Sequence, residues 1–159
     1  MEFCFEQVIN ASREVLFAFH ANPPNLAVLF RDDPTFRLLH HDGDIRPGCT
    51  TWFENTVAWC VPVVMGFRHI AYEPPHRFCD ELIHGPYERF MHTHEFEECP
   101  EGGLVRDRLD VRLSWQYGGE TVLRLVIAPR IRRAFAFRQR ALERIVAAGG
   151  LRKLAASCP

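Results

Sequence analysis

The chain has few features of a secreted, membrane-spanning or nucleic-acid-binding protein. No apolar run approaches the roughly 20 residues that a membrane-spanning helix needs. No secretory signal follows Met1, because the strand-like segment EFCFEQVI begins at once. Neither charge is in excess, since 19 basic and 20 acidic side chains give a formal net charge of −1. We therefore expect no membrane span, no nucleic-acid partner and a cytoplasmic location.

Motifs for several kinds of catalysis are also missing. The six cysteines show no CxxC spacing, so we expect free thiols. There is no G-x-S-x-G segment for a serine nucleophile and no glycine-rich loop to hold a phosphate. We expect no cofactor and no bound metal ion. No repeat, low-complexity tract or linker interrupts the chain, which predicts one domain over residues 1–159.

What the chain does have is apolar material, with 47% hydrophobic residues and 13 phenylalanines. Alternation over 2–9 predicts a first strand, and Ser12 suits the N-cap of a short helix. Pro24 suits the first turn of a second short helix, which Asp32-Asp33-Pro34 would end. Short links containing proline or glycine then separate six further predicted strands, at 35–41, 49–59, 63–73, 76–84, 87–98 and 104–117.

After Gly118-Gly119 the hydrophobic period changes to three and four residues. This predicts one long amphipathic helix from Leu123 to about Ala148, which Pro129 should either kink or start. Its basic residues are interpreted as a solvated face: Arg130, Arg132, Arg133, Arg138, Arg140 and Arg144. The layout is α+β, with a curved seven-stranded antiparallel sheet wrapping the long helix and two short helices between strands one and two. A cavity is expected where the curved sheet and the helix separate.

The strand predicted at 87–98 carries the most informative pattern. Phe90, His92, His94 and Phe96 alternate, so all four share one face of the sheet. If that face points inward, both imidazoles are buried and each needs a polar partner.

The next strand supplies such a partner. Its alternate residues from Val105 to Trp115 are apolar except for Asp107, which must therefore point inward. A turn at 100–103 places His94 opposite Asp107 and His92 opposite Leu109. Either Asp80 or Arg77 would extend this polar patch, and the length of the turn at Gly85-Pro86 decides which.

Three interpretations of His92, His94 and Asp107 remain open. They form a satisfied network that rigidifies the sheet, or they present polar groups to an apolar ligand. In the third interpretation they carry out chemistry, either acid–base or assisted by a metal that Asp107 or Asp80 helps to hold.

The sequence resembles the START-like, or SRPBCC, superfamily, which includes polyketide cyclase-like proteins. The similarity extends over nearly the whole chain and includes the opening segment 11–26. Its most specific part is a phrase made of Phe78, Asp80, Gly85, Pro86, Tyr87, Phe90, His92, His94 and Phe96. The resemblance implies a helix-grip fold with a deep, mostly apolar pocket. It does not imply one reaction, because the superfamily includes lipid carriers, hormone receptors, aromatase/cyclases and oxygenase domains.

We therefore predict that the chain binds a small or medium-sized hydrophobic or aromatic molecule between the sheet and the long helix. The predicted ligand-binding residues are His92, His94, Asp107, Asp80, Phe90 and Trp115. The alternative is a cyclase/aromatase-like enzyme that transfers protons through His92, His94 and Asp107. A third hypothesis is partner binding through the sheet edge or the long helix, and a homodimer stays open.

Overall fold

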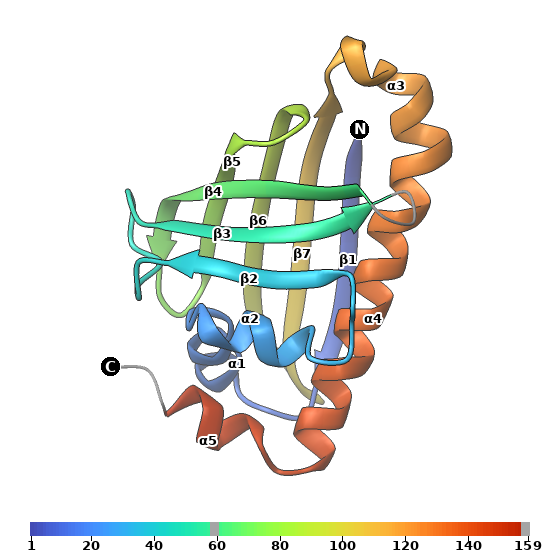
Figure 1. The fold of residues 1–159 in the computed structure, drawn as a ribbon. Coiled ribbons are helices and arrows are strands. Elements are labelled where there is room, and N and C mark those ends of the chain that lie inside the picture. Colours follow the sequence, from blue (N-terminus) through green and yellow to red (C-terminus); the bar gives the residue numbers. More distant parts are fainter. Residues whose placement is uncertain (58–60, 157–159) are drawn as a thin grey trace.

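The computed structural model describes residues 1–57 and 61–156 (Figure 1). Its seven strands form one antiparallel sheet in the order β1-β7-β6-β5-β4-β3-β2. The strands are β1 (Glu2–Ile9), β2 (Phe36–His41), β3 (Thr50–Val57), β4 (Val61–Glu73), β5 (Arg77–His84), β6 (Tyr87–Cys99) and β7 (Gly102–Leu113). The predicted sheet is confirmed. The predicted strand 49–59 reaches past β3 into residues 58–59, which lie outside the described part of the chain.

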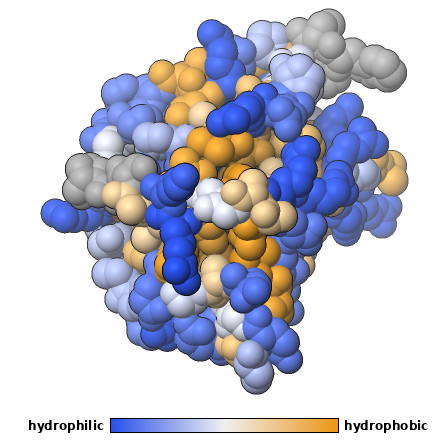
Figure 2. Space-filling model, turned by 90° about the horizontal axis from the view of Figure 1, so that it is seen from below, coloured by the Kyte–Doolittle hydropathy of each residue, from blue (hydrophilic) through white to orange (hydrophobic). Residues whose placement is uncertain are grey.

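The sheet bends strongly around a long helix. In Figure 1, β2, β3 and β4 run across the direction of β6, β7 and β1, and α4 (Ala128–Ala147) lies along one side of the bend. Helices α1 (Arg13–His20), α2 (Pro24–Leu29) and α5 (Leu151–Ala155) gather at the lower end of the molecule. Seen from below, this end has an apolar strip between hydrophilic margins (Figure 2).

Local signals explain the short helices. The Ser12 side chain accepts a hydrogen bond from the Val15 backbone N–H and so caps α1, as its sequence predicts. Pro24 occupies the first turn of α2, where its missing N–H costs nothing. Helix α5, which follows Gly149-Gly150, is an element that the sequence analysis does not anticipate.

The packed core lies in two clusters. One joins α1 and α5 to the sheet and includes Leu16, Phe17, Phe78 and Phe96. The other joins β7 and β1 to the start of the long helical segment and includes Leu123. These two clusters hold the sheet to the helices at separate places. The space between the two clusters therefore does not have to be filled by side chains.

The end of β7 and the start of the long helix differ from the prediction. β7 stops at Leu113, four residues before the predicted end, and η1 (Trp115–Tyr117) is a 3-10 turn. Helical structure begins with α3 (Gly119–Val122), continues through the π-helical η2 (Leu123–Ile127) and passes into α4. Pro129 lies in the first turn of α4, directly after the π-helical segment, so helical structure begins before this proline and not at it.

Two further sequence expectations can be compared with the structure. The four cysteines within the described residues, Cys4, Cys49, Cys79 and Cys99, are free thiols. Among the helices described, none combines the length and the apolar character needed to cross a membrane.

Candidate functional site

A cavity of about 790 Å³ lies between the sheet, α2 and α4. Its wall is mostly apolar and includes Phe19, Leu29, Phe53, Met65, Phe67, Phe90, Leu109, Ile131, Ala134 and Phe135. Exposed lining residues lie on the α2–β2 connection, at the start of β4 and on α4, so the cavity communicates with solvent there. Pro34, Val61 and Arg133 are among them.

The inward face of β6 carries two histidines into this wall. The register pairs His94 with Asp107 and His92 with Leu109, as the alternation predicts. His92 Nε2 lies 3.0 Å from Asp107 Oδ1, and His94 Nδ1 lies 2.7 Å from the same oxygen. One carboxylate oxygen therefore contacts both imidazoles.

Helix α4 contributes the balancing charge. Arg138 donates from Nη1 to Asp107 Oδ1 over 2.9 Å, and both side chains are only 8% exposed. The interpretation of Arg138 as part of a solvated face is therefore wrong. It lies on the inward stripe of the long helix, beside Ala134 and Phe135, and a charged residue on an apolar stripe is the sequence signal that reveals it.

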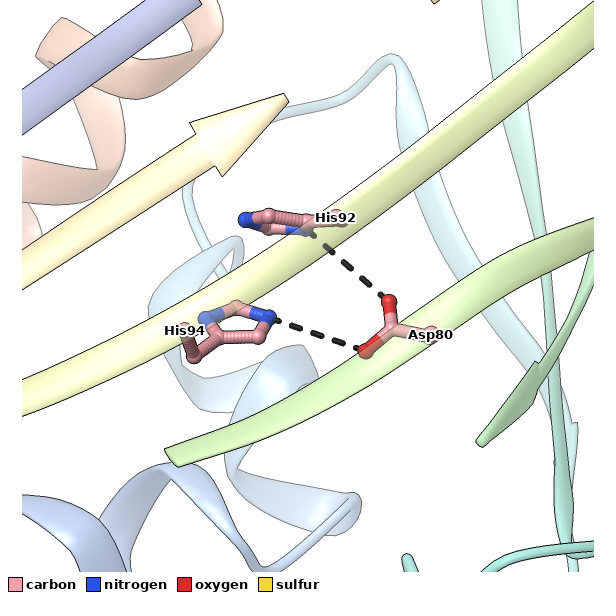
Figure 3. Close-up of side chains that lie close together, drawn as sticks. All are labelled: Asp80, His92 and His94. Carbon is pink, nitrogen blue, oxygen red and sulfur yellow. Dashed lines mark ion pairs between the residues drawn. The ribbon is translucent and has the colours of Figure 1, made fainter. Parts of the chain in front are cut away.

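Strand β5 brings a second carboxylate to the site. The register pairs Asp80 with His92, and Asp80 is buried, whereas Arg77 is exposed. Figure 3 shows the Asp80 carboxylate directed from β5 toward the two imidazoles on β6. Asp80 Oδ2 is 3.9 Å from His92 Nδ1, and Asp80 Oδ1 is 3.8 Å from His94 Nε2.

A third histidine approaches Asp80 from β4. His69 is 5% exposed, and its Nδ1 lies 3.6 Å from Asp80 Oδ1. Its other ring nitrogen lies 3.1 Å from the Thr51 hydroxyl on β3. His69 is not among the site residues predicted from the sequence, although Met65, Phe67 and His69 alternate onto one face of β4.

The electrostatics of the Asp107 group favour an ionised carboxylate beside a neutral imidazole. Burial alone would raise the pKa of Asp107, but the Arg138 charge and the two histidines hold it well below its usual value. Burial lowers the pKa of His94 to about 4, with the neighbouring His92 adding to the effect. For Asp80, burial opposes ionisation, yet contacts with His69, His94 and His92 leave its pKa lowered.

His20 closes the site from the end of α1. Its Nδ1 donates to the Leu16 carbonyl over 2.8 Å, and its Nε2 is buried with no hydrogen-bond partner among the residues that the structure describes. Burial lowers the pKa of His20 to about 3, and the charge of Arg138 acts in the same direction. Its ring centroid lies 6.5 Å from that of His94, so the imidazole belongs to the same polar group.

Not every predicted site residue lines the cavity. His92, His94, Asp80 and Phe90 do, whereas Asp107 lies behind the imidazoles and orients them. The placement of Trp115 in the cavity is wrong. Because β7 ends at Leu113, the two-residue alternation does not extend to Trp115, whose exposed fraction is 86%.

Comparison with known proteins gives a match in fold. No protein-family model matches the sequence, and no curated protein matches it either. Protein Ms6760 from Mycobacterium smegmatis superposes with a TM-score of 0.71 at 15% identity, covering 93% of this chain and 92% of that one. The AHSA1-like protein from Aeromonas hydrophila gives 0.65 at 16%, covering 95% of each chain. Major latex-like protein 151 from Panax ginseng gives 0.66 at 10%, covering 90% of this chain and 95% of that one.

The chain has the helix-grip fold. The predicted resemblance to START-like proteins is thereby confirmed in architecture. At these identities the likeness concerns the helix-grip scaffold alone, so any argument about function has to come from the cavity and its polar group.

Proposed function

We propose that this helix-grip protein binds a small or medium-sized apolar or aromatic molecule in the cavity between the sheet and α4. The observation that carries the proposal is a space of about 790 Å³ with a mostly apolar wall and a few convergent polar side chains. Ligand sites in proteins are typically about 300–1,000 Å³ and have this composition. The apolar wall would supply most of the binding energy, and the polar group would select the orientation.

His92 is the residue that we expect to contact a polar atom of the ligand. Its side chain is 14% exposed, more than that of His94 or Asp107, and it lines the cavity. Asp107 fixes the ring from behind. The ligand should therefore carry one hydrogen-bonding group on an otherwise apolar body.

Partner binding is less well supported as the main role. That hypothesis predicts a filled core beside an exposed apolar patch. The apolar strip of Figure 2 supplies a patch, but the interior contains a large cavity.

Proton transfer is the second candidate, and the hydrogen bond of His92 to Asp107 at 3.0 Å favours it. A carboxylate behind an imidazole is the arrangement of a general base. Arg138 weakens this argument, because it shares the Asp107 charge that would otherwise raise the basicity of the ring. If the chain is an enzyme, a bound ligand should change mass on incubation, and His92→Gln should abolish that change while the ligand still binds.

A pair of tryptophan substitutions on α4 tests the binding proposal. Ala134 lines the cavity, so Ala134→Trp should fill part of it. Ala136 lies on the opposite face of the same helix and does not line the cavity, so Ala136→Trp is the matched control. We expect the fluorescent apolar probe 8-anilinonaphthalene-1-sulfonate to bind the parent chain and the control, with an affinity at least about tenfold lower for Ala134→Trp. Equal binding to all three folded proteins would contradict the proposal.

A further inference from the structure

The two imidazoles on β6 each turn one ring nitrogen toward Asp107. His92 Nε2 makes a hydrogen bond of 3.0 Å with Asp107 Oδ1, and His94 Nδ1 lies 2.7 Å from the same oxygen. Arg138 Nη2 lies 3.4 Å from His94 Nδ1. The opposite nitrogens, His92 Nδ1 and His94 Nε2, are therefore directed away from Asp107.

Both of these nitrogens face the Asp80 carboxylate, as Figure 3 shows. Within the described part of the chain, Asp80 Oδ1 and the neighbouring Nδ1 atom of His69 are both buried without a hydrogen-bond partner. Among the described residues, the only ion-pair contacts of Asp80 are with His69, His92 and His94. Burying a carboxylate oxygen without a partner is costly, and a cation between Asp80 and the two rings would offset that cost.

We propose that Asp80, His92 and His94 bind a divalent first-row transition-metal ion. Their ligand atoms all lie within 4.8 Å of one another. Two ligands about 2.1 Å from a tetrahedral ion are about 3.4 Å apart. Asp80 lies 3.9 Å from His92 through Oδ2 and 3.8 Å from His94 through Oδ1, so side-chain rotation would bring the ligands to the ion. The proposal departs from the expectation, based on the sequence, that the chain holds no metal. It does not depend on the proposed ligand-binding function.

The surroundings of the three side chains match those of metal sites. Metal-binding histidines commonly hydrogen-bond a carboxylate through their second ring nitrogen. Here His92 Nε2 makes such a bond with Asp107, and His94 Nδ1 contacts the same carboxylate at 2.7 Å. Asp80 and Asp107 outweigh Arg138 by one negative charge when the histidines are neutral, so a divalent cation is compatible with the group. All three ligands line the cavity, which gives the ion a path from solvent and leaves a coordination position open toward the cavity.

The ligand types select the class of ion. Two imidazole nitrogens and one carboxylate suit Zn²⁺, Co²⁺ or Fe²⁺. Mg²⁺ and Ca²⁺ prefer sets of oxygen ligands, which this group does not offer. Weak or absent Mg²⁺ binding is therefore part of the proposal.

The test uses the untagged full chain, stripped of metal with a chelator and then dialysed. Isothermal titration with Zn²⁺ alone measures stoichiometry and affinity, and Co²⁺ absorbance reports nitrogen and oxygen coordination. We expect one Zn²⁺ per chain and much weaker binding of Mg²⁺. Asp80→Asn and His94→Gln should each weaken Zn²⁺ binding about 100-fold or more, since even an outer partner contributes about 10- to 100-fold. Asp107→Asn should weaken it about 10-fold or more.

The control is His40→Ala, which removes an exposed histidine that lies 3.1 Å from Asp42 on the surface. This variant should bind Zn²⁺ as the parent does. Circular dichroism and thermal melting verify that each variant folds, and Asp80→Asn preserves the shape of the side chain. The proposal is overturned if the parent binds no Zn²⁺, if binding survives both Asp80→Asn and His94→Gln, or if Mg²⁺ binds equally well. Probe binding in the cavity is measured separately, so failure of one proposal is distinguishable from failure of the other.

Discussion

The two faces of β6 and β7 carry similar charged residues in opposite environments. On the outer face, Arg106 contacts Glu95 and Glu97, and Arg108 contacts Glu95. On the inner face, Asp107 meets His92, His94 and Arg138 beside the cavity. Arg108 is 55% exposed, whereas Arg138 is 8% exposed. Water can replace any partner on the outside, whereas the inner partners are largely shielded from it.

This difference decides what each group can do. Exposed ion pairs contribute little to stability and hold no fixed geometry. Buried charges are costly to desolvate, so each needs a complete set of partners, and a missing partner becomes informative. Asp107 has its partners, whereas Asp80 Oδ1 has no hydrogen-bond partner in the described part of the chain. The inner face therefore combines Asp107, which has its partners and orients the two imidazoles, with the unsatisfied carboxylate oxygen of Asp80 beside the cavity.

The largest expected effect comes from breaking the buried pair. Arg138→Met keeps most of the side-chain volume but leaves Asp107 without its cation, and we expect it to lower the free energy of unfolding by about 3–5 kcal/mol. Urea denaturation measures this loss. Adding Asp107→Asn to Arg138→Met should restore much of it. A loss below about 1 kcal/mol in the single variant would contradict the contrast between the faces.

An intermediate effect should appear as the pH falls. The pKa of His20 is about 3 in the folded chain and about 6.5 when unfolded, so below pH 6.5 the unfolded state takes up more protons. Stability from the neutral ring is therefore present above pH 6.5 and is lost on acidification, by about 2 kcal/mol between pH 7 and pH 5. His20→Gln should lack this contribution. Denaturation of both proteins in the presence of a chelator measures the free energy of unfolding at each pH. If this free energy changes with pH in the same way for the parent and for His20→Gln, the prediction is wrong.

The smallest effect is expected on the outer face. Arg108→Met removes an exposed partner of Glu95 and should cost about 1 kcal/mol or less. The difference from the parent should shrink further in high salt, because salt screens exposed charges. A loss as large as that of Arg138→Met would show that burial does not separate the two faces.

The sequence predicts the paired strands of the site well. Strand alternation has a period of two, so one inward residue fixes the others, and the short turn fixes the register of His94 with Asp107. The sequence cannot decide whether Arg77 or Asp80 points inward, because irregular pairing near a turn changes which face of the sheet a residue occupies. The described pairing of β5 with β6 runs only from Arg77 and Glu95 to Glu81 and Met91, and so stops short of the Gly85-Pro86 turn.

Contacts between distant elements are harder to predict. Arg138 joins Asp107 only because α4 crosses the sheet at that point, and its position depends on a helix start within a π-helical and proline-containing segment. Trp115 is misplaced because alternation gives no sign of where a strand ends. His20 and His69 lie on elements whose approach to β6 depends on the bend of the sheet, which the chain's local pattern does not specify.

The central claim is that the cavity holds a small molecule, and native mass spectrometry of the untagged chain purified from its own host tests it most directly. We predict one organic molecule bound per chain, present in Ala136→Trp and absent in Ala134→Trp. The claim would be contradicted if the parent chain showed only its own mass and if no apolar compound from a host extract bound to it.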